Sequence, residues 1–260
     1  MIRSLWIAKT GLDAQQTNLD VIANNLANAS TTGFKRVKPM FEDLLYQTLR
    51  AAGSSSGADS QVPSGLQVGS GVRLGATERI LSQGALVKTE NPLDVAINGN
   101  GYFQVQLPDG TVAYTRDGNL ARNSQGQIVT QAGFLVAPGI TIPTDALSVS
   151  ISDAGQVSAV LPGNPQPVVL GDLTLVTFVN RGGLAATGAN LFVETAASGP
   201  PTQGLPGTDG LGSLLQSYSE ASNVNVAEEL IALIQAQRAY ELNTRAIKAS
   251  DEMLQRVSQL

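Results

Sequence analysis

Apolar residues recur every seven positions at both ends of this 260-residue chain. Near the start the repeat consists of Leu5, Leu12, Leu19 and Leu26. Near the end it consists of Val226, Leu233, Tyr240, Ile247 and Leu254. Seven residues span close to two turns of an α-helix, so each repeat places an apolar stripe along one helix face. The spacing predicts one long helix over residues 4–29 and a second over residues 226–257.

The two predicted helices carry end signals. Ser4 is a suitable N-cap for the first helix, and Gly33 stands where a left-handed stop is favoured. Asn225 followed by Glu228 supplies the second helix with an N-cap and a reciprocal carboxylate. The residues predicted to pack helix on helix are Leu5, Leu12, Leu19, Ile22, Leu26, Val226, Leu230, Leu233, Tyr240, Ile247 and Leu254. A two-helix hairpin within one chain is an alternative, but stripes at opposite chain ends favour packing between molecules.

The stretch between the helices favours an antiparallel β domain. Glycine and proline are concentrated in residues 53–213, where they separate short runs rich in Val, Ile, Thr and Phe. Pro108-Asp109-Gly110 and Asp153-Ala154-Gly155 predict hairpin turns, and residues 98–101, NGNG, predict a tight hairpin turn between two strands. Alternation of Leu, Val or Phe with Thr predicts a strand over residues 173–179.

Composition removes most kinds of chemistry. The chain has no cysteine and no histidine, so it lacks thiol nucleophiles, disulfides, the usual zinc ligands and the usual general base at neutral pH. A net charge of −5 argues against nucleic acid binding. Apolar runs stay well below the ~18 residues of a membrane-spanning helix. We therefore expect no catalytic, cofactor-binding or metal-binding residues, no nucleic acid partner and no membrane insertion.

The two ends also carry motifs that occur together in one family. Residues 10–36 are TGLDAQQTNLDVIANNLANASTTGFKR, and residues 222–255 are SNVNVAEELIALIQAQRAYELNTRAIKASDEMLQ. In this order, they resemble the terminal signatures of bacterial flagellar rod and hook proteins. DVAINGNGYFQV at 94–105 and AYTRDG at 113–118 resemble the middle domain of the same family.

Three further segments resemble the distal rod members of this family most. They are the opening residues 1–20, FEDLLYQT at 41–48 and PSGLQVGSGVR at 63–73. The resemblance implies a structural subunit of the distal rod and not an enzyme. It also implies polymerisation into a helical hollow drive shaft that transmits torque to the hook and lines the export channel.

The same resemblance implies the fold, the partners and the location. The fold class is α+β, with the terminal helices pairing as a coiled-coil-like layer and a central antiparallel β domain. Expected partners are further copies of the chain, proximal rod proteins, the hook protein, the outer ring (bushing) proteins and the flagellar export apparatus. The expected location is the basal-body rod that crosses the periplasm, reached without a cleavable signal peptide.

Five segments follow from composition and resemblance together. They are the N-terminal helical part of an inner assembly domain (1–45), an extended hairpin or linker (46–75), the β domain (76–200), a linker (201–221) and the C-terminal helical part (222–260). Alternating apolar residues in 46–75 predict an extended hairpin. Because the segment is too rich in Gly and Ser to hold a shape alone, we expect neighbouring subunits to order it and, in the shaft that the resemblance implies, this contact to stiffen the assembly. The residues predicted to make this contact are Leu66, Val68, Val72 and Leu74.

Other functions stay open from the sequence. A proximal rod or hook subunit is the nearest alternative within the family. A secreted β-rich binding module explains the middle of the chain but leaves the terminal repeats without a purpose. A cell-wall hydrolase needs two carboxylates facing each other across a cleft, whereas the paired acids here are neighbours on helices.

Overall fold

The computed structural model describes residues 2–53 and 63–258 and divides into two compact units. The helical unit comprises Met1–Ala27, Val37–Glu78 and Asn225–Leu260. The β unit comprises Asn28–Arg36 and Arg79–Val224. Early and late parts of the sequence therefore meet in both units. The five segment ranges expected from the sequence stay a prediction.

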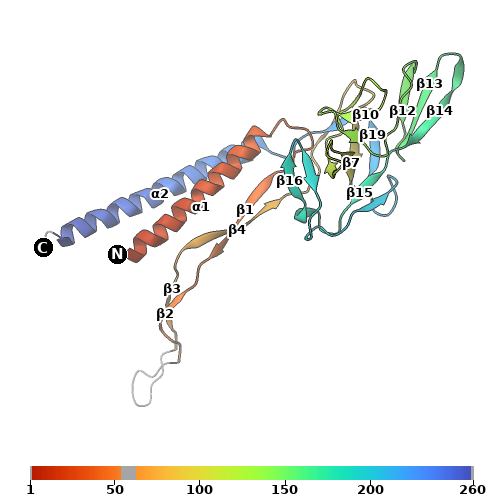
Figure 1. Cartoon of the computed structure of the whole chain (residues 1–260). Helices are drawn as coiled ribbons and strands as arrows, with labels where there is room; N and C mark the ends of the chain where they lie inside the picture. The colour runs from red at the N-terminus through yellow and green to blue at the C-terminus, as the bar shows by residue number, and fades with distance from the viewer. Residues whose placement is uncertain (1, 54–62, 259–260) are drawn as a thin grey trace. The chain divides into compact units, whose positions relative to one another are not determined.

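The helical unit contains two long helices that run antiparallel and side by side (Figure 1). α1 spans Ile2–Ala27 and α2 spans Val226–Ser258, close to the predicted ranges. The helices pack on each other within the chain, which corrects the expectation that their stripes favour packing between molecules. The Asn225 cap is confirmed, because its Oδ1 accepts a hydrogen bond from the Ala227 amide and its Nδ2 donates to Glu228 Oε1, both at 3.1 Å.

Gly33 does not end the first helix. α1 stops at Ala27, and turns occupy the residues that follow it. Gly33 has the left-handed φ of +69° that its prediction required, but its amide donates to the carbonyl oxygen of Glu220 at 2.8 Å. The prediction of a helix stop is wrong because this conformation serves a contact inside the β unit.

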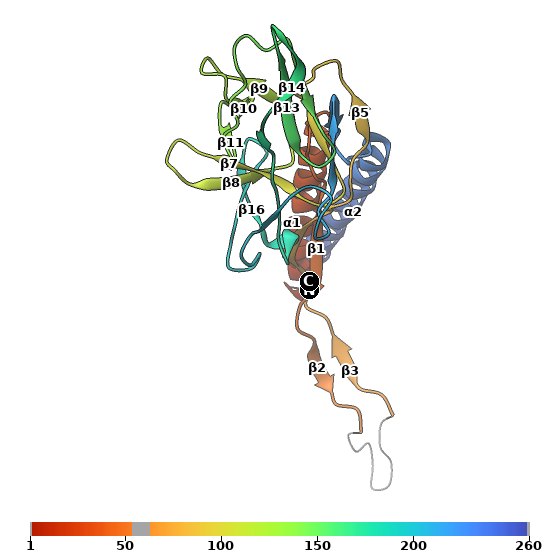
Figure 2. The same cartoon turned by 90° about the vertical axis from the view of Figure 1, so that its right-hand side faces the viewer.

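A long hairpin completes the helical unit. β1 (Val37–Asp43) pairs with β4 (Val72–Arg79), and β2 (Gln47–Arg50) pairs antiparallel with β3 (Leu66–Val68), as Figure 2 shows. Between residues 46 and 75, β2 and β3 form a two-stranded hairpin, and the alternating apolar residues fall on two strands, β3 and β4, with a break at residues 69–71.

An antiparallel sheet forms the centre of the β unit and has nine strands within the described residues. Seven of them follow in the order β16 (Ala185–Gly188), β17 (Leu191–Val193), β8 (Val112–Thr115), β7 (Tyr102–Gln106), β11 (Leu135–Val136), β10 (Ile128–Thr130) and β9 (Leu120–Arg122). The other two are β15 (Leu175–Thr177), which pairs with β7, and β18 (Thr202–Gly204), which pairs with β15. The antiparallel β domain is therefore confirmed.

Smaller sheets surround this one. Their strands are β12 (Ser148–Ile151), β13 (Gln156–Leu161) and β14 (Asn164–Asp172) in one sheet, β6 (Val95–Asn98) with β19 (Ser213–Gln216), and β5 (Leu86–Lys88) with β20 (Tyr218–Glu220). A short 3₁₀ helix, η1, spans Arg181–Gly183. Residues 201–221, expected as a linker, instead supply β18, β19 and β20, because their glycines and prolines separate strands of three or four residues.

The predicted turns hold in part. Gly110 and Gly155 have φ values of +83° and +89° and close the β7–β8 and β12–β13 hairpins, as expected. The NGNG turn joins β6 to β7, but these strands pair with other partners, so the prediction of a turn between paired strands is wrong. The strand expected over 173–179 is shorter, since β15 covers only Leu175–Thr177.

Two apolar clusters fill the β unit. The larger lies around Phe103, Ile97 and Leu214, all of which are fully buried. The smaller contains aromatic rings in edge-to-face contact, with Tyr114 and Phe178 centroids 4.8 Å apart. In the part of the chain that the structure describes, no helix is long and apolar enough to cross a membrane.

Candidate assembly surfaces and a buried charged cluster

The predicted helix-packing residues are only partly enclosed by the α1–α2 contact. On α1, Ile22 is buried and the four leucines of the repeat are half-buried. On α2, Leu233, Ile247 and Leu254 are half-buried, whereas Val226, Leu230 and Tyr240 are exposed. The helix pair thus brings many of the predicted residues toward its contact and leaves some on the surface.

The most buried positions on α2 are residues that the heptad analysis missed. Glu229, Ala236 and Ser250 lie on one stripe with seven- or fourteen-residue spacing, and each is buried. Small residues allow close approach of the partner helix: a Cβ added at Gly11 of α1 would lie 3.0 Å from Nδ2 of Asn243. A search for small residues at heptad spacing, rather than large apolar ones, could have found Ala236 and Ser250 but not Glu229.

A buried amide joins three elements of the helical unit. The Nδ2 atom of Asn25, which is 2% exposed, donates to the Val37 carbonyl at 2.8 Å and to Glu229 Oε2 at 3.4 Å. Its Oδ1 accepts from the Val37 amide at 3.0 Å. Asn25 therefore ties the end of α1 to the start of β1 and to the first turns of α2.

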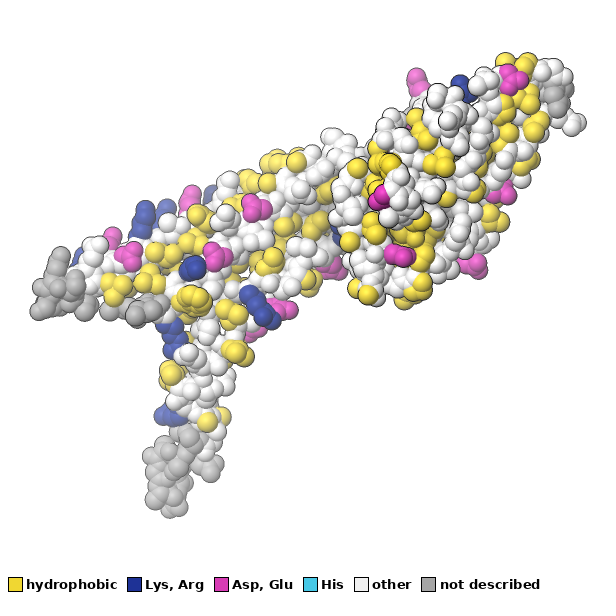
Figure 3. All heavy atoms as spheres, viewed as in Figure 1, with side chains coloured by type: hydrophobic (Ala, Val, Ile, Leu, Met, Phe, Trp, Pro, Cys, Tyr) yellow, Lys and Arg dark blue, Asp and Glu magenta, His cyan; other side chains and the backbone are white. Residues whose placement is uncertain are grey.

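Apolar side chains remain exposed on α2. Leu230, Ile231, Ile234 and Leu242 are 44%, 58%, 49% and 64% exposed. Figure 3 shows hydrophobic side chains along the visible surface of the helix pair, between charged ones. Ile234 and Leu242 line an open groove with Gln237, Arg238, Glu241 and Arg245. These exposed apolar side chains make this face of α2 a candidate protein interaction surface.

The hairpin residues predicted to stiffen an assembly lie at its surface. Leu66 and Leu74 are 53% and 40% exposed, and Val68 and Val72 are half-buried. Val72 and Leu74 line a second groove with α1 residues that include Thr10 and Ala14. The hairpin base meets α1 so closely that a Cβ added at Gly71 would overlap the Thr10 hydroxyl.

Three charged side chains meet inside the β unit, and we call them the charged cluster: Lys35, Arg116 and Glu220. Glu220 Oε1 accepts from Lys35 Nζ at 2.5 Å, and its Oε2 accepts from Arg116 Nε at 2.6 Å. The three side chains are 5%, 6% and 1% exposed. Buried charges persist only where partners compensate them, so the two cations depend on the Glu220 carboxylate between them.

Backbone groups complete the charged cluster. Arg116 donates from Nη1 to the Gly101 carbonyl at 2.6 Å, and from Nη2 to the carbonyls of Ile97 at 3.0 Å and Gly99 at 2.6 Å. The NGNG segment therefore wraps its carbonyl oxygens around a guanidinium group. Lys35 Nζ also donates to the Ser82 carbonyl at 2.8 Å. These carbonyl dipoles offset the excess of two cations over one carboxylate.

Burial and pairing shift the ionisation of this cluster. Burial lowers the pKa of Lys35, and the nearby Glu220 carboxylate only partly opposes this shift. Burial on its own would raise the pKa of Glu220, but Arg116 and Lys35 together hold that pKa below its ordinary value. Glu220 is therefore an ionised carboxylate at neutral pH.

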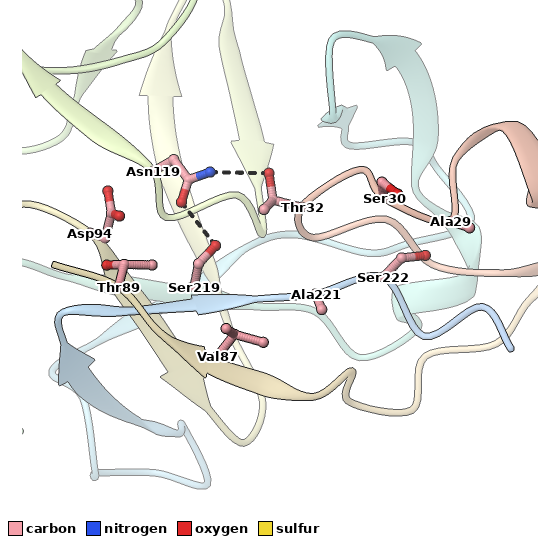
Figure 4. A pocket seen from close by; sticks show the side chains of 10 residues that line it. All are labelled: Ala29, Ser30, Thr32, Val87, Thr89, Asp94, Asn119, Ser219, Ala221 and Ser222. Carbon is pink, nitrogen blue, oxygen red and sulfur yellow. Dashed lines mark hydrogen bonds between the residues drawn. The ribbon is translucent and has the colours of Figure 1, made fainter. Parts of the chain in front are cut away.

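Figure 4 shows a small pocket in the β unit. Its volume is about 300 Å³, and hydroxyl and small side chains line it, including Ser30, Thr89 and Ser222. Asn119 crosses it, donating to Thr32 Oγ1 at 3.2 Å and accepting from Ser219 Oγ at 2.8 Å. The described residues contain no group of acidic, histidine or cysteine side chains that could hold a metal ion.

Family comparisons match three segments of this chain. Residues 5–35 match a family described as flagella basal body rod protein. Residues 96–159 match the flagellar hook protein FlgE/F/G D1 domain, and residues 215–260 match the C-terminal part of flagellar basal body rod FlgEFG proteins. These matches define the class as the rod and hook proteins of the bacterial flagellum.

Full-length relatives narrow the class. The flagellar basal-body rod protein FlgG of Buchnera aphidicola subsp. Acyrthosiphon pisum is 56% identical over 100% of both chains. FlgG of Caulobacter vibrioides is 53% identical over 100% of this chain and 99% of its own. The FlgF rod protein of the same organism is 37% identical over 89% of this chain and 87% of its own.

The chain therefore belongs to the FlgG family of flagellar basal-body rod proteins. It is a structural subunit of the distal rod in the flagellar basal body, where it serves motility, and it is not an enzyme. It assembles into the rod polymer with neighbouring rod and hook proteins. The resemblance drawn from the sequence is confirmed.

Proposed function

We propose that the chain polymerises into a helical, hollow drive shaft that transmits torque to the hook and lines an export channel. In this proposal the terminal segments, 1–45 and 222–260, form an inner layer in which α1 and α2 pair as a coiled coil. The helix-packing residues named from the sequence act as the self-assembly residues.

The exposed apolar side chains of α2 are the observation that carries this proposal. Leu230 and Ile234 are each nearly half exposed although α2 already packs on α1. Burying the exposed half of such a side chain contributes on the order of 1 kcal/mol. A polymer repeats this contact at every subunit, because contacts that do not close into a ring extend into a filament.

The hairpin supplies a second proposed contact. Leu66, Val68, Val72 and Leu74 would pack on neighbouring subunits and stiffen the shaft. Leu45 and Leu49 of the same segment are also exposed, at 89% and 59%. Residues 54–62 of this segment lie outside the described residues.

The proposed partners follow from the place of the distal rod. They are further copies of the chain, proximal rod proteins, the hook protein, the outer ring proteins that act as a bushing, and the flagellar export apparatus. We propose that the subunit leaves the cell through that apparatus without a cleavable signal peptide.

Electron microscopy of concentrated purified protein tests the proposal. Wild-type protein should form straight tubes with a central channel. Leu230→Asp should prevent tube formation, because it places a carboxylate in an apolar contact. Gln235→Asp, at an exposed polar position of the same helix, is the matched control and should assemble. Normal tubes from the Leu230 variant would contradict the proposed helix contact.

A second experiment tests the hairpin. Deletion of residues 54–62 shortens the segment without touching the four named side chains. A curved or pliable tube would support a stiffening role. A tube that stays straight and rigid would place the stiffness elsewhere.

A further inference from the structure

Three connecting segments of the β unit meet at the charged cluster. The first connector, Asn28–Arg36, follows α1 in the chain. The middle connector, Ile80–Ala85, lies between β4 and β5, and the last connector, Ala221–Val224, precedes α2. The chain enters and leaves the β unit through these three segments. The contacts that attach them to the sheets therefore decide how rigidly the β unit is joined to the rest of the chain.

Glu220 makes contact with two of the connectors. Its Oε1 accepts from Lys35 of the first connector and from the Gly84 amide of the middle one, at 2.5 and 3.0 Å. Its backbone carbonyl accepts from the Gly33 amide at 2.8 Å. Arg116 fixes the same carboxylate to β8 and to the carbonyls of the NGNG segment. One carboxylate thus joins two connectors to the body of the β unit.

Asn223 joins all three connectors through its side-chain amide. Its Oδ1 accepts from the Arg36 amide at 2.6 Å, and its Nδ2 donates to the carbonyls of Ile80 at 2.8 Å and Ser82 at 3.1 Å. The Ile80 amide donates in turn to the Arg36 carbonyl at 2.8 Å. These bonds cross-link backbone groups of segments that lie up to 187 residues apart in the chain.

Asn119 adds a third bridge on the pocket side. Figure 4 shows it between Thr32 of the first connector and Ser219 of β20. Packing is also tight here, because a Cβ added at Gly84 would overlap the carbonyl oxygen of Ala221. The first connector is therefore held at two points, by Lys35 in the charged cluster and by Asn119 at Thr32.

Each of the three family-matched segments contributes to this junction. Lys35 ends the first matched segment, Arg116 and Asn119 belong to the second, and Glu220 and Asn223 belong to the third. The signatures that identify the family by sequence thus come together in space at the connectors. The two apolar clusters already give the β unit a stable core, so this convergence of polar residues needs a reason other than core stability.

We propose that Glu220, Asn223 and Asn119 are positioning residues that fasten the connectors to the β unit, so that load carried by the helices enters the β unit here. This inference rests on the proposed drive-shaft function. Loss of one bridge should loosen the connectors while the sheet stays folded. The shaft should then assemble but transmit torque poorly under load.

Amide hydrogen exchange on the full-length subunit tests the fastening. Asn223→Ala removes the acceptor of the Arg36 amide, and exchange at Arg36 should accelerate at least tenfold. Amides of β7 and β8 should keep their wild-type rates. The control is Gln203→Ala, which removes an exposed hydrogen bond to Thr174 in the same unit. An unchanged rate at Arg36, or equal acceleration throughout the sheet, would overturn the proposal.

A milder variant keeps the test decisive if Asn223→Ala fails to fold. Asn119 lines the pocket, so in Asn119→Ala water can enter and replace the lost hydrogen bonds to Thr32 and Ser219. It should accelerate exchange in the first connector alone. Two results together would refute a positioning role: exchange at Gly33 equal to wild type in Asn119→Ala, and failure of Asn223→Ala to fold. Asn119 and Asn223 would then contribute only to general stability.

Swimming under load tests the consequence. Cells producing the Asn223→Ala chain as their sole copy should build rods of normal number and length, and their speed should fall more steeply with viscosity than in Gln203→Ala cells. Equal speed at every viscosity, or absence of rods, would refute the load-bearing role. Failure of purified wild-type protein to form tubes would instead refute the proposed function. The hydrogen-exchange result on the connectors would remain valid in that case, because it does not depend on tube formation.

Discussion

Replacing Glu220 by glutamine should destabilise the β unit far more than replacing Lys35 by methionine. The carboxylate compensates two buried cations, so Glu220→Gln leaves both Lys35 and Arg116 without a counter-charge. Lys35→Met leaves the neutral pair of Arg116 and Glu220 intact. Glu220→Gln therefore increases the net positive charge of the cluster, whereas Lys35→Met removes it.

The structure gives the magnitudes. Breaking a buried ion pair from one side costs about 3–5 kcal/mol, and we expect this cost for Glu220→Gln. A domain of roughly 150 residues loses about 2–4 °C in Tm per kcal/mol, so the variant should melt about 6–20 °C below wild type. Burial lowers the pKa of Lys35, so the ionised ammonium costs free energy in the fold. Lys35→Met should therefore change stability by no more than about 1 kcal/mol.

The double variant supplies the sharpest comparison. Lys35→Met combined with Glu220→Gln removes one of the two uncompensated cations and should recover about 1–3 kcal/mol relative to Glu220→Gln alone. Urea unfolding followed by near-ultraviolet circular dichroism reports the β unit through the buried rings of Tyr102 and Tyr114. Glu42→Gln, in the exposed pair with Arg73, is the control and should leave this transition unchanged. Equal losses for the two single variants, or no recovery in the double variant, would refute the charge argument.

Three further outcomes are expected. The pKa of Glu220 is lowered in the folded protein, so its ionised carboxylate stabilises the fold fully above the ordinary value of 4.5, and this stabilisation is lost as the pH falls through the lower folded value. Burial raises the pKa of Asp117, so its ionised carboxylate destabilises the fold and its protonation in acid has the opposite effect. Acid titration of unfolding should therefore show a steeper loss below pH 4.5 in wild type than in Glu220→Gln, and parallel curves would contradict this assignment. Asn25→Ala should cost the helical unit about 2–4 kcal/mol, because buried groups of Val37 lose their partners; exchange at the Val37 amide should accelerate, and exchange as slow as in an Asp20→Ala control would speak against it. Leu12→Asp and Leu233→Asp should each abolish rod assembly while circular dichroism retains the β signal, and motility close to wild type in either variant would disprove the helix contact.

The sequence by itself determined the elements whose signals are local. Seven-residue repeats located α1 and α2 to within two residues at each end, and Asn225 with Glu228 marked the α2 cap. Gly110 and Gly155 marked hairpin turns because only a local backbone conformation is required there. Helical repeats and turns each depend on residues a few positions apart, so a single sequence contains the whole signal.

The tertiary structure decided what depends on distant partners. Lys35, Arg116 and Glu220 are residue types that usually lie at the surface. Nothing near them in the sequence shows that Glu220 pairs with two cations that lie 104 and 185 residues away. The strands β18, β19 and β20 are three or four residues long, too short to show a period, and they exist because β15, β6 and β5 offer edges to pair with. The NGNG segment likewise turns where a hairpin was expected, but its carbonyls face a buried guanidinium, and only the folded chain brings that group to them.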